Sequence, residues 1–298
     1  MNEILSIQNL SKNYGKIKAV DDLSFTVEKG TVYGILGPNG SGKTTTLSVI
    51  TGVLHPASGS YRWFGNKPGK WERKRIGSLI EIPNFYPYLT LFQNLQIVAR
   101  IKNVPEEDIN RVLGITDILK RKYSRFDTLS LGMKQRLSFA SVLLGDPEVL
   151  VLDEPANGLD PEGIAEVRKI IISERDKGKT IIIASHILDE VEKVCTHVGI
   201  LKMGKLIASG LVDKLLVMDS VVTVSAPDNT KLKEILEKSG LVKNIKEDID
   251  SITATILSET EPGEINKYVI GKGITLTRLE VNKPTLESQF LELVREQN

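Results

Sequence analysis

Residues 37–44 have the sequence GPNGSGKT, which says more about the fold than any other part of the chain. The spacing matches the phosphate-binding pattern G-x-x-x-x-G-K-[ST]. Its glycines let the backbone curl around an anion, because they lack a Cβ and tolerate positive φ. The Lys43 ammonium supplies positive charge for the outer phosphates, and the Thr44 hydroxyl is placed to ligate Mg²⁺. We therefore expect a triphosphate to bind along Gly37, Pro38, Asn39, Gly40, Ser41, Gly42, Lys43, Thr44 and Thr45.

The residues that flank this loop support the same interpretation. Residues 4–10 and 22–27 are predicted to form strands that lead into the glycine loop. Residues 31–36 are predicted to form a short buried strand, and residues 45–50 a helix whose positive dipole end faces the loop. Strand, glycine loop and helix are the setting that the motif requires. The alternative, a chance match in a glycine-rich turn, does not explain both neighbours. The sequence thus predicts an α/β fold.

Composition limits the classes of protein. The 298 residues suffice for one large or two medium domains, and 41% hydrophobic with 26% charged residues is ordinary for a globular chain. The formal net charge of +1 argues against a dominant nucleic-acid-binding surface, so no nucleic acid is expected as a partner. The one cysteine, Cys195, allows no internal disulfide and fits a reducing compartment.

No segment is predicted to enter a membrane by itself. The N-terminus lacks the basic and apolar regions of a signal peptide. The longest apolar runs, such as residues 181–184, have the length of a strand and not the roughly 20 residues of a membrane span. We therefore expect that only a partner protein holds this chain at a membrane.

A second motif, VLVLDEP at residues 149–155, is an apolar strand that ends in two carboxylates. Ligands of a parallel sheet bind beyond the carboxyl ends of its strands, so Asp153 and Glu154 are expected at the same edge as the glycine loop. Asp153 would hold Mg²⁺, and Glu154 would orient and deprotonate the attacking water. The alternative is a strand end with a solvated acidic turn. The glycine loop upstream favours the functional interpretation.

A third motif, LSLGMKQR at residues 129–136, carries a family resemblance. With the two motifs above, in this order, the chain over about residues 1–215 resembles the ATPase subunit of an ABC transporter. The resemblance implies a P-loop NTPase fold with a RecA-like core and a helical subdomain, which fits the helix-type periodicity of residues 92–145. Leu131 and Met133 depart from the Gly and Gln that are usual in the family.

The resemblance also implies roles for other residues. Ser130 and Gly132, at a helix N-terminus, would close on ATP held by a second ABC ATPase subunit, expected to be an identical copy. His186 resembles the histidine that touches the γ-phosphate and helps to align the attacking water, although a lone histidine is usually structural. Three further nucleotide contacts are implied, at Tyr14, Val20 and Asp160. Tyr14 would stack on adenine, and the alternative is an ordinary half-buried tyrosine. Val20 follows Tyr14 in the same stretch of sequence, and Asp160 belongs to the D-loop of the family.

Glu81 stands where the family keeps a glutamine. A carboxylate offers a charged oxygen but no N–H donor, so its role as a ligand of Mg²⁺ and nucleotide differs from that of an amide. We expect Glu81 to link nucleotide state to the membrane partner. Together with LSLGM, Glu81 resembles the subgroup that exports bacitracin or lantibiotic-type peptides and confers immunity to them.

Aromatic residues cluster immediately after Glu81. Four of the 16 in the chain lie within eight residues: Phe85, Tyr86, Tyr88 and Phe92. Local core packing would explain them, and so would a groove that receives a short helix of a transmembrane permease subunit. Pro83 and Pro87 favour the groove, because they disfavour a buried regular element.

Residues 219–298 follow a different pattern. Strands are predicted at 221–225, 242–246, 251–257 and 274–281, and helices at 231–238, 264–270 and 285–296. The order βαββαβ, followed by a helix, resembles a small ferredoxin-like α+β module. We therefore predict an ABC ATP-binding domain at 1–218 and a C-terminal accessory domain at 219–298, either regulatory, dimer-supporting or a passive extension.

The predicted function is hydrolysis of ATP, with Mg²⁺, to drive export of a peptide antibiotic or similar amphipathic compound. The chain would sit at the cytoplasmic face of the membrane, held by its permease. The alternatives are a soluble ABC-type ATPase that is not coupled to transport, an exporter of another substrate class, and a P-loop kinase or GTPase. The last leaves residues 129–136 and His186 unexplained.

Overall fold

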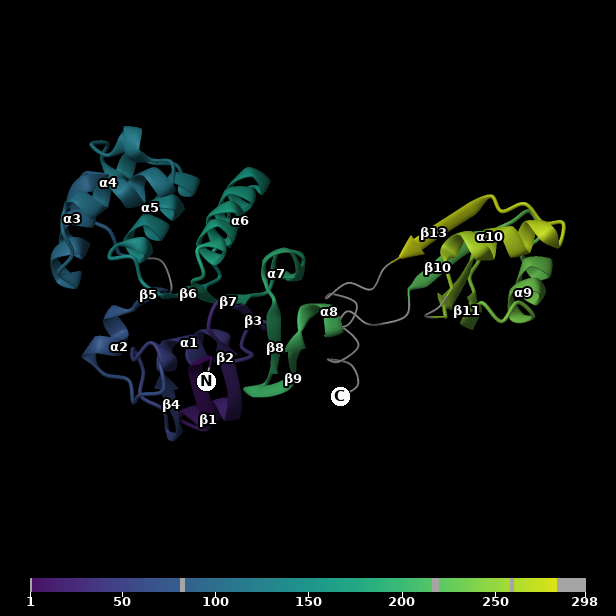
Figure 1. Cartoon of the computed structure of the whole chain (residues 1–298), viewed down its shortest axis with the longest axis horizontal. Coiled ribbons are helices and arrows are strands. Elements are labelled where there is room, and N and C mark those ends of the chain that lie inside the picture. The colour runs from purple at the N-terminus through teal and green to yellow at the C-terminus, as the bar shows by residue number, and fades with distance from the viewer. Residues whose placement is uncertain (1, 81–83, 216–219, 258–259, 283–298) are drawn as a thin grey trace. The chain divides into compact units, whose positions relative to one another are not determined.

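The computed structural model describes residues 2–80, 84–215, 220–257 and 260–282 (Figure 1). The chain divides into two compact units, Met1–Val212 and Asp213–Asn298. Each unit has its own sheet and its own buried core. The predicted boundary between residues 218 and 219 lies outside the described residues.

The larger unit contains a six-stranded sheet with the order β5-β6-β7-β3-β8-β9. Every residue of β3, β6 and β7 is buried, as expected for apolar strands that are covered on both faces of a parallel sheet. β9 (Lys205–Leu211) is antiparallel to its neighbour and forms a hairpin with it. The parallel strands are β3 (Val32–Leu36), β5 (Ile76–Leu79), β6 (Val149–Asp153), β7 (Thr180–Ser185) and β8 (His197–Lys202).

Helices and a second sheet complete this core. α1 (Lys43–Ile50) packs on β6 and β7, while α6 (Pro161–Asp176) packs on β7 and on α7 (Leu188–Val194). One hydrophobic cluster contains residues of the antiparallel sheet, of α1 and of the parallel strands. The strand before the glycine loop and the helix after it are therefore anchored in the same core. The antiparallel sheet has the order β2-β1-β4, with β1 (Glu3–Tyr14), β2 (Ile17–Glu28) and β4 (Ser58–Trp63), and a short helix, α2 (Lys70–Lys74), follows it.

The predicted helical region forms a separate group of helices beside this core (Figure 1). It consists of α3 (Leu91–Lys102), α4 (Glu107–Ile115) and α5 (Leu131–Leu143), with short 3₁₀ turns at Leu119–Arg121 and Phe126–Thr128. Thr90 is the N-cap of α3, and its side chain forms a capping box with Gln93. Ser130 is the N-cap of α5, and its Oγ accepts a hydrogen bond from the Met133 N–H.

The smaller unit contains a four-stranded antiparallel sheet with the order β11-β12-β10-β13. Its core includes Val222, Leu232, Ile252 and Ile265, which come from both strands and helices. The predicted helix at 285–296 lies outside the described residues. The elements are α8 (Val212–Leu215), β10 (Val221–Ser225), α9 (Asn229–Glu237), β11 (Val242–Glu247), β12 (Ile252–Ile256), α10 (Pro262–Gly271) and β13 (Arg278–Asn282).

Within the described ranges, no helix of either unit combines the length and the apolar character that crossing a bilayer requires.

Candidate functional site

The glycine loop joins β3 to α1 and turns back on itself. Gly40 and Gly42 adopt φ values of +80° and +104°, which side chains disfavour. A Cβ on Gly42 would lie 2.3 Å from the carbonyl oxygen of Ala19, so only glycine fits there. The buried Lys43 side chain lies along the loop, and its Nζ donates to the carbonyl oxygens of Gly37 (2.7 Å) and Pro38 (3.4 Å). The loop is thus a tight cradle with a cation at its centre.

The residues of this loop suit an anionic ligand. α1 has no acidic side chain in its first turn and no side-chain cap, so its N-terminal N–H groups remain available to an anion. Ser41 Oγ is buried and has no hydrogen-bond partner among the described residues. A pocket of about 270 Å³ opens here, lined by Ala19, Asn39, Gly40, Ser41, Gly42, Lys43, Thr44, Thr45 and Glu154.

The ends of three strands bring the predicted catalytic residues together. β7 lies between β6 and β3, so the residues that follow these strands share one sheet edge. Glu154 Oε2 lies 2.8 Å from His186 Nδ1 and accepts a longer hydrogen bond, 3.3 Å, from the His186 backbone N–H. Glu154 Oε1 lies 3.5 Å from Lys43 Nζ. The predicted grouping of Lys43, Glu154 and His186 is present in the structure.

The backbone at Glu154 fixes its carboxylate. Its φ of 45° is left-handed, and its N–H donates to the Ala184 carbonyl oxygen at 2.9 Å. A non-glycine residue in this region stores strain of order 1–3 kcal/mol, which is common at functional sites. Glu154 is therefore held to the neighbouring strand by its backbone and to His186 by its side chain.

Thr44 and Asp153 have the chemistry of a magnesium site. Both line a pocket of about 610 Å³ beside the glycine loop, together with Glu154. Hydroxyl and carboxylate oxygens are hard donors of the kind that Mg²⁺ binds in combination with phosphates. The same pocket extends to Phe85 and Phe126, whose ring centres are 5.3 Å apart. The residues present therefore fit Mg²⁺.

Ser130, Gly132 and Asp160 lie in another pocket, of about 410 Å³, whose lining includes none of residues 37–45. Ser130 caps α5, and Asp160 caps α6 by accepting the Gly163 N–H at 2.9 Å. A Cβ on Gly132 would meet no atom within 4 Å, so this face of α5 is open. Within one chain the predicted site residues thus form two groups.

The other predicted contacts have varied environments. Tyr14, at the end of β1, is 49% exposed, and Lys12 Nζ lies 5.9 Å from its ring centre. Val20 has no exposed surface, and its neighbour Ala19 lines the loop pocket in its place. Glu81 lies outside the described residues.

Gln135 was not predicted as a residue of the site. Its Nε2 donates to the Pro155 carbonyl oxygen at 2.7 Å, which ties α5 to the residues after Glu154. Its position within the third motif was the available signal, since a polar side chain five residues after Ser130 needs a partner once α5 packs on the core.

These features define a class of protein. A phosphate-binding loop, a carboxylate beside its lysine, and a histidine that contacts the carboxylate form the site of a P-loop NTPase that transfers a phosphoryl group to water.

Comparisons with known proteins identify the family. Residues 20–157 match a family model described as ABC transporter. The chain is 37% identical to the bacitracin transport ATP-binding protein BcrA of Bacillus licheniformis, over 99% of this chain and 98% of that protein. It is 42% identical to the lantibiotic transport ATP-binding protein SrtF of Streptococcus pyogenes, over 68% of this chain and 89% of that protein. Its structure matches cbiO1 of Clostridium perfringens, part of the ABC transporter complex cbiONQ, with a TM-score of 0.66, 28% identity, and coverage of 80% and 96% of the two chains.

The chain belongs to the ATP-binding proteins of ABC transporters. Proteins of this family bind nucleotide, hydrolyse ATP and work with permease components. The predicted family and ATPase activity are confirmed, and the exporter interpretation is favoured over an ATPase that is not coupled to transport.

Proposed function

We propose that this chain is the ATP-hydrolysing subunit of a peptide-antibiotic exporter and works as a homodimer under a transmembrane permease. Its resemblance to a bacitracin transport protein over nearly the whole length of both chains supports this cargo class. The lantibiotic transport protein supports the same class over a shorter region. Held by its permease, the chain would act at the cytoplasmic face of the membrane.

The cluster of Lys43, Glu154 and His186 carries the catalytic proposal. Glu154 accepts the proton of the attacking water. Its contact with His186 Nδ1 at 2.8 Å keeps the carboxylate oriented toward that water. Lys43 neutralises charge on the outer phosphates. When bound, Mg²⁺ neutralises further phosphate charge, and Thr44 and Asp153 are the residues that would hold it. Glu81 is proposed as a further ligand.

The two separate pockets support a dimer that shares its sites. Ser130, Gly132 and Asp160 line a pocket apart from the glycine loop of the same chain. The N-terminus of α5 has an open face and no acidic residue in its first turn, so it suits an anion. We propose that this surface covers the ATP held by a second copy, whose Tyr14 stacks on adenine.

Replacing Glu154 by Gln tests the catalytic proposal. The amide keeps the shape of the side chain but cannot take a proton, so ATP turnover should fall by roughly 10²–10⁴-fold. MgATP binding should persist, and a stable ATP-bound dimer should accumulate, as measured by analytical ultracentrifugation. Glu107→Gln, an exposed carboxylate in α4, is the matched control. Turnover by Glu154→Gln within about threefold of wild type would contradict the assignment.

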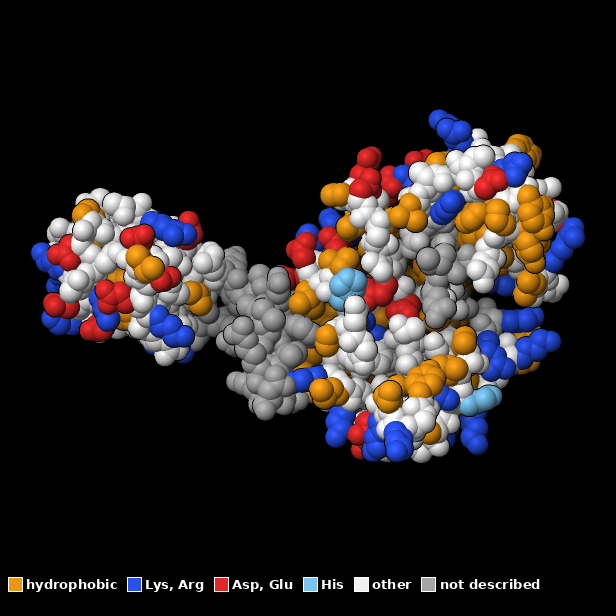
Figure 2. All heavy atoms as spheres, turned by 180° about the vertical axis from the view of Figure 1, so that it is seen from behind, with side chains coloured by type: hydrophobic (Ala, Val, Ile, Leu, Met, Phe, Trp, Pro, Cys, Tyr) orange, Lys and Arg blue, Asp and Glu red, His pale blue; other side chains and the backbone are white. Residues whose placement is uncertain are grey.

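The region around α3 is the proposed docking surface for the permease. Hydrophobic side chains gather over α3 in the space-filling view, and Lys and Arg side chains gather nearby over α2 (Figure 2). Tyr86 and Tyr88 are 48% and 64% exposed, whereas Phe85 and Phe92 are partly buried. Each phenylalanine packs against a neighbouring aromatic ring, Phe85 on Phe126 and Phe92 on Tyr123, whereas the exposed tyrosines support a groove for a permease helix.

We propose that residues 219–298 form a ferredoxin-like accessory domain. Its described elements follow the order βαββαβ, and each helix joins a central strand to an edge strand of the sheet. This split βαβ arrangement supports the assignment. Because the domain holds none of the proposed catalytic residues, we assign it a regulatory or dimer-supporting role.

A further inference from the structure

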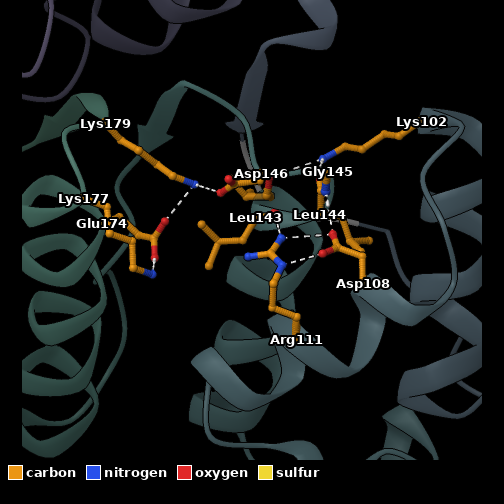
Figure 3. Close-up of polar contacts among 11 residues, drawn as sticks. Lys102, Asp108, Arg111, Leu143, Leu144, Gly145, Asp146, Glu174, Lys177 and Lys179 are labelled. Carbon is orange, nitrogen blue, oxygen red and sulfur yellow. Dashed lines mark hydrogen bonds and ion pairs between the residues drawn. The ribbon is translucent and has the colours of Figure 1, made fainter.

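The C-terminal end of α5 is capped by two cations from neighbouring helices (Figure 3). The last four carbonyl groups of a helix have no partners within the helix. Here Lys102 Nζ, from α3, donates to the carbonyl oxygens of Ser141 (2.8 Å), Val142 (3.2 Å) and Leu144 (3.3 Å). Arg111 Nη2, from α4, donates to the Leu143 carbonyl oxygen at 3.0 Å. Four successive carbonyl oxygens thus accept hydrogen bonds from positive side chains. The positive charges also interact favourably with the negative end of the helix dipole.

The two capping cations differ in exposure, because Lys102 is partly buried whereas Arg111 is exposed. Asp108 accepts hydrogen bonds from Arg111 Nε, from Arg111 Nη2 at 3.0 Å, and from the Gly145 N–H at 2.8 Å. Burial lowers the pKa of Lys102 to about 8, and the Asp108 carboxylate opposes this shift. Placing an ammonium group there is costly in desolvation, and the three carbonyl contacts offset that cost.

The turn after α5 is held from the other side as well. Asp146 Oδ1 accepts a hydrogen bond from Lys179 Nζ at 2.6 Å, and Lys179 Nζ lies 2.8 Å from Oε2 of the fully buried Glu174. Lys177 Nζ bonds the other oxygen of Glu174 at 2.5 Å. Figure 3 shows this continuous set of polar contacts, which runs from α3 and α4 to the segment that joins α6 and β7.

This turn connects the two groups of site residues. α5 begins next to Ser130 and has 13 residues, so its two ends are about 20 Å apart. After the turn, β6 runs to Asp153, and Glu154 follows. The position of this turn therefore helps to set where Ser130 stands relative to Glu154, together with the hydrogen bond from Gln135 to the Pro155 carbonyl oxygen.

We propose that Lys102 and Arg111 are positioning residues for the ATP-bound dimer, and that their cap on α5 holds Ser130 where it can meet the nucleotide of the second copy. This inference rests on the dimer proposed above. Neither side chain lines the glycine-loop pocket, so binding of MgATP to one chain should not depend on them.

The test uses full-length chains that carry Glu154→Gln, so that dimers persist. Lys102→Met keeps most of the side-chain stem but removes the ammonium. Arg111→Lys keeps the charge but replaces the two nitrogens that bond Asp108 by a single ammonium group. Lys120→Met, an exposed lysine in the same subdomain, is the matched control. The measurements are MgATP affinity at low protein concentration, and the dimer dissociation constant at saturating MgATP by analytical ultracentrifugation.

We expect Lys102→Met to raise the dimer dissociation constant by roughly tenfold, the scale of one favourable interaction at a helix end. Arg111→Lys should give a smaller rise in the same direction, and Lys120→Met none. MgATP affinity should stay within about twofold in all three variants. If Lys102→Met does not fold, Arg111→Lys decides the question.

An unchanged dimer constant in folded Lys102→Met and in Arg111→Lys would overturn the proposal. So would a loss of MgATP affinity as large as the loss of dimerisation, because that indicates general damage. Failure of Glu154→Gln alone to form ATP-bound dimers would overturn the proposed function itself, and it is recognisable because Lys102 and Arg111 are then intact.

Discussion

Gly42 shows how a single residue determines the phosphate cradle. Its φ is left-handed, and a Cβ would lie 2.3 Å from a backbone oxygen that cannot move away easily. Gly40 is also left-handed, but a Cβ there would meet no atom within 4 Å. An alanine at Gly40 would therefore carry only the cost of an unfavourable φ, whereas an alanine at Gly42 would add the cost of a steric clash.

We predict that Gly42→Ala lowers MgATP affinity by roughly tenfold or more, since the loop must shift to relieve the clash. Gly40→Ala should cost only the strain of a left-handed alanine, about 1 kcal/mol of stability, with a smaller effect on binding. Titration with a fluorescent ATP analogue and urea unfolding of both variants measure these effects. Equal effects of the two substitutions would contradict the argument.

Residues of the site were predictable where a short motif and a strand end coincide. Lys43 and Thr44 belong to one contiguous pattern, and Glu154 and His186 follow apolar strands whose ends share an edge. Lys102, Arg111 and Gln135 were not predicted, because their partners are backbone carbonyls of segments 20 or more residues away. A sequence does not show which carbonyls a long side chain reaches.

At the scale of elements, α3 holds the exposed loop that precedes it. Asn94 is buried in α3, and its Oδ1 accepts the Tyr86 N–H at 2.8 Å. Its Nδ2 donates to the carbonyl oxygens of Tyr86 (3.1 Å) and Thr90 (3.0 Å). One amide thus fixes the backbone that presents Tyr86 and Tyr88 to solvent.

We predict that Asn94→Leu releases this loop and weakens binding to the permease about fivefold or more, while basal ATP turnover stays within about twofold. Loss of these partly buried hydrogen bonds should lower the free energy of unfolding by roughly 1–3 kcal/mol. Gln96→Leu, on the same helix but bonded to the exposed Glu106 side chain, is the control. Copurification measures binding to the permease, an ATPase assay measures basal turnover, and urea unfolding measures stability. Normal copurification of Asn94→Leu would contradict the role of the loop.

Elements with continuous apolar runs were predicted well. β6 and β7 lie at the predicted apolar runs, because strands that are buried on both faces consist mostly of apolar residues. The first two strands were predicted at residues 4–10 and 22–27 but extend over Glu3–Tyr14 and Ile17–Glu28. Their added ends are mostly exposed and polar, so hydrophobic alternation does not mark them. The last strand of the smaller unit begins at Arg278 and not at residue 274, although Ile274 is buried.

At the scale of the whole molecule, the chain contains two separate cores. The larger unit holds all of the described residues that we assign to ATP, and the smaller unit buries its own cluster of apolar side chains. Units with separate cores can unfold separately.

We predict that a chain truncated to residues 1–218 folds and binds MgATP within about twofold of the full-length affinity. In the Glu154→Gln background it should form weaker ATP-bound dimers if the smaller unit supports dimerisation. Calorimetry of the full-length protein should show two transitions, of which only one shifts with MgATP. A truncated chain that fails to bind MgATP would contradict the independence of the larger unit.

The burial of Cys195 has a practical consequence for fluorescence measurements of this protein's motions. Its side chain is 8% exposed, and burial raises the pKa of its thiol, so little thiolate is present near neutral pH. The native chain therefore behaves toward maleimide reagents as though it had no cysteine. A fluorophore attached to a cysteine introduced at the exposed position of Tyr88 would label one place alone, and no native residue would have to be removed first.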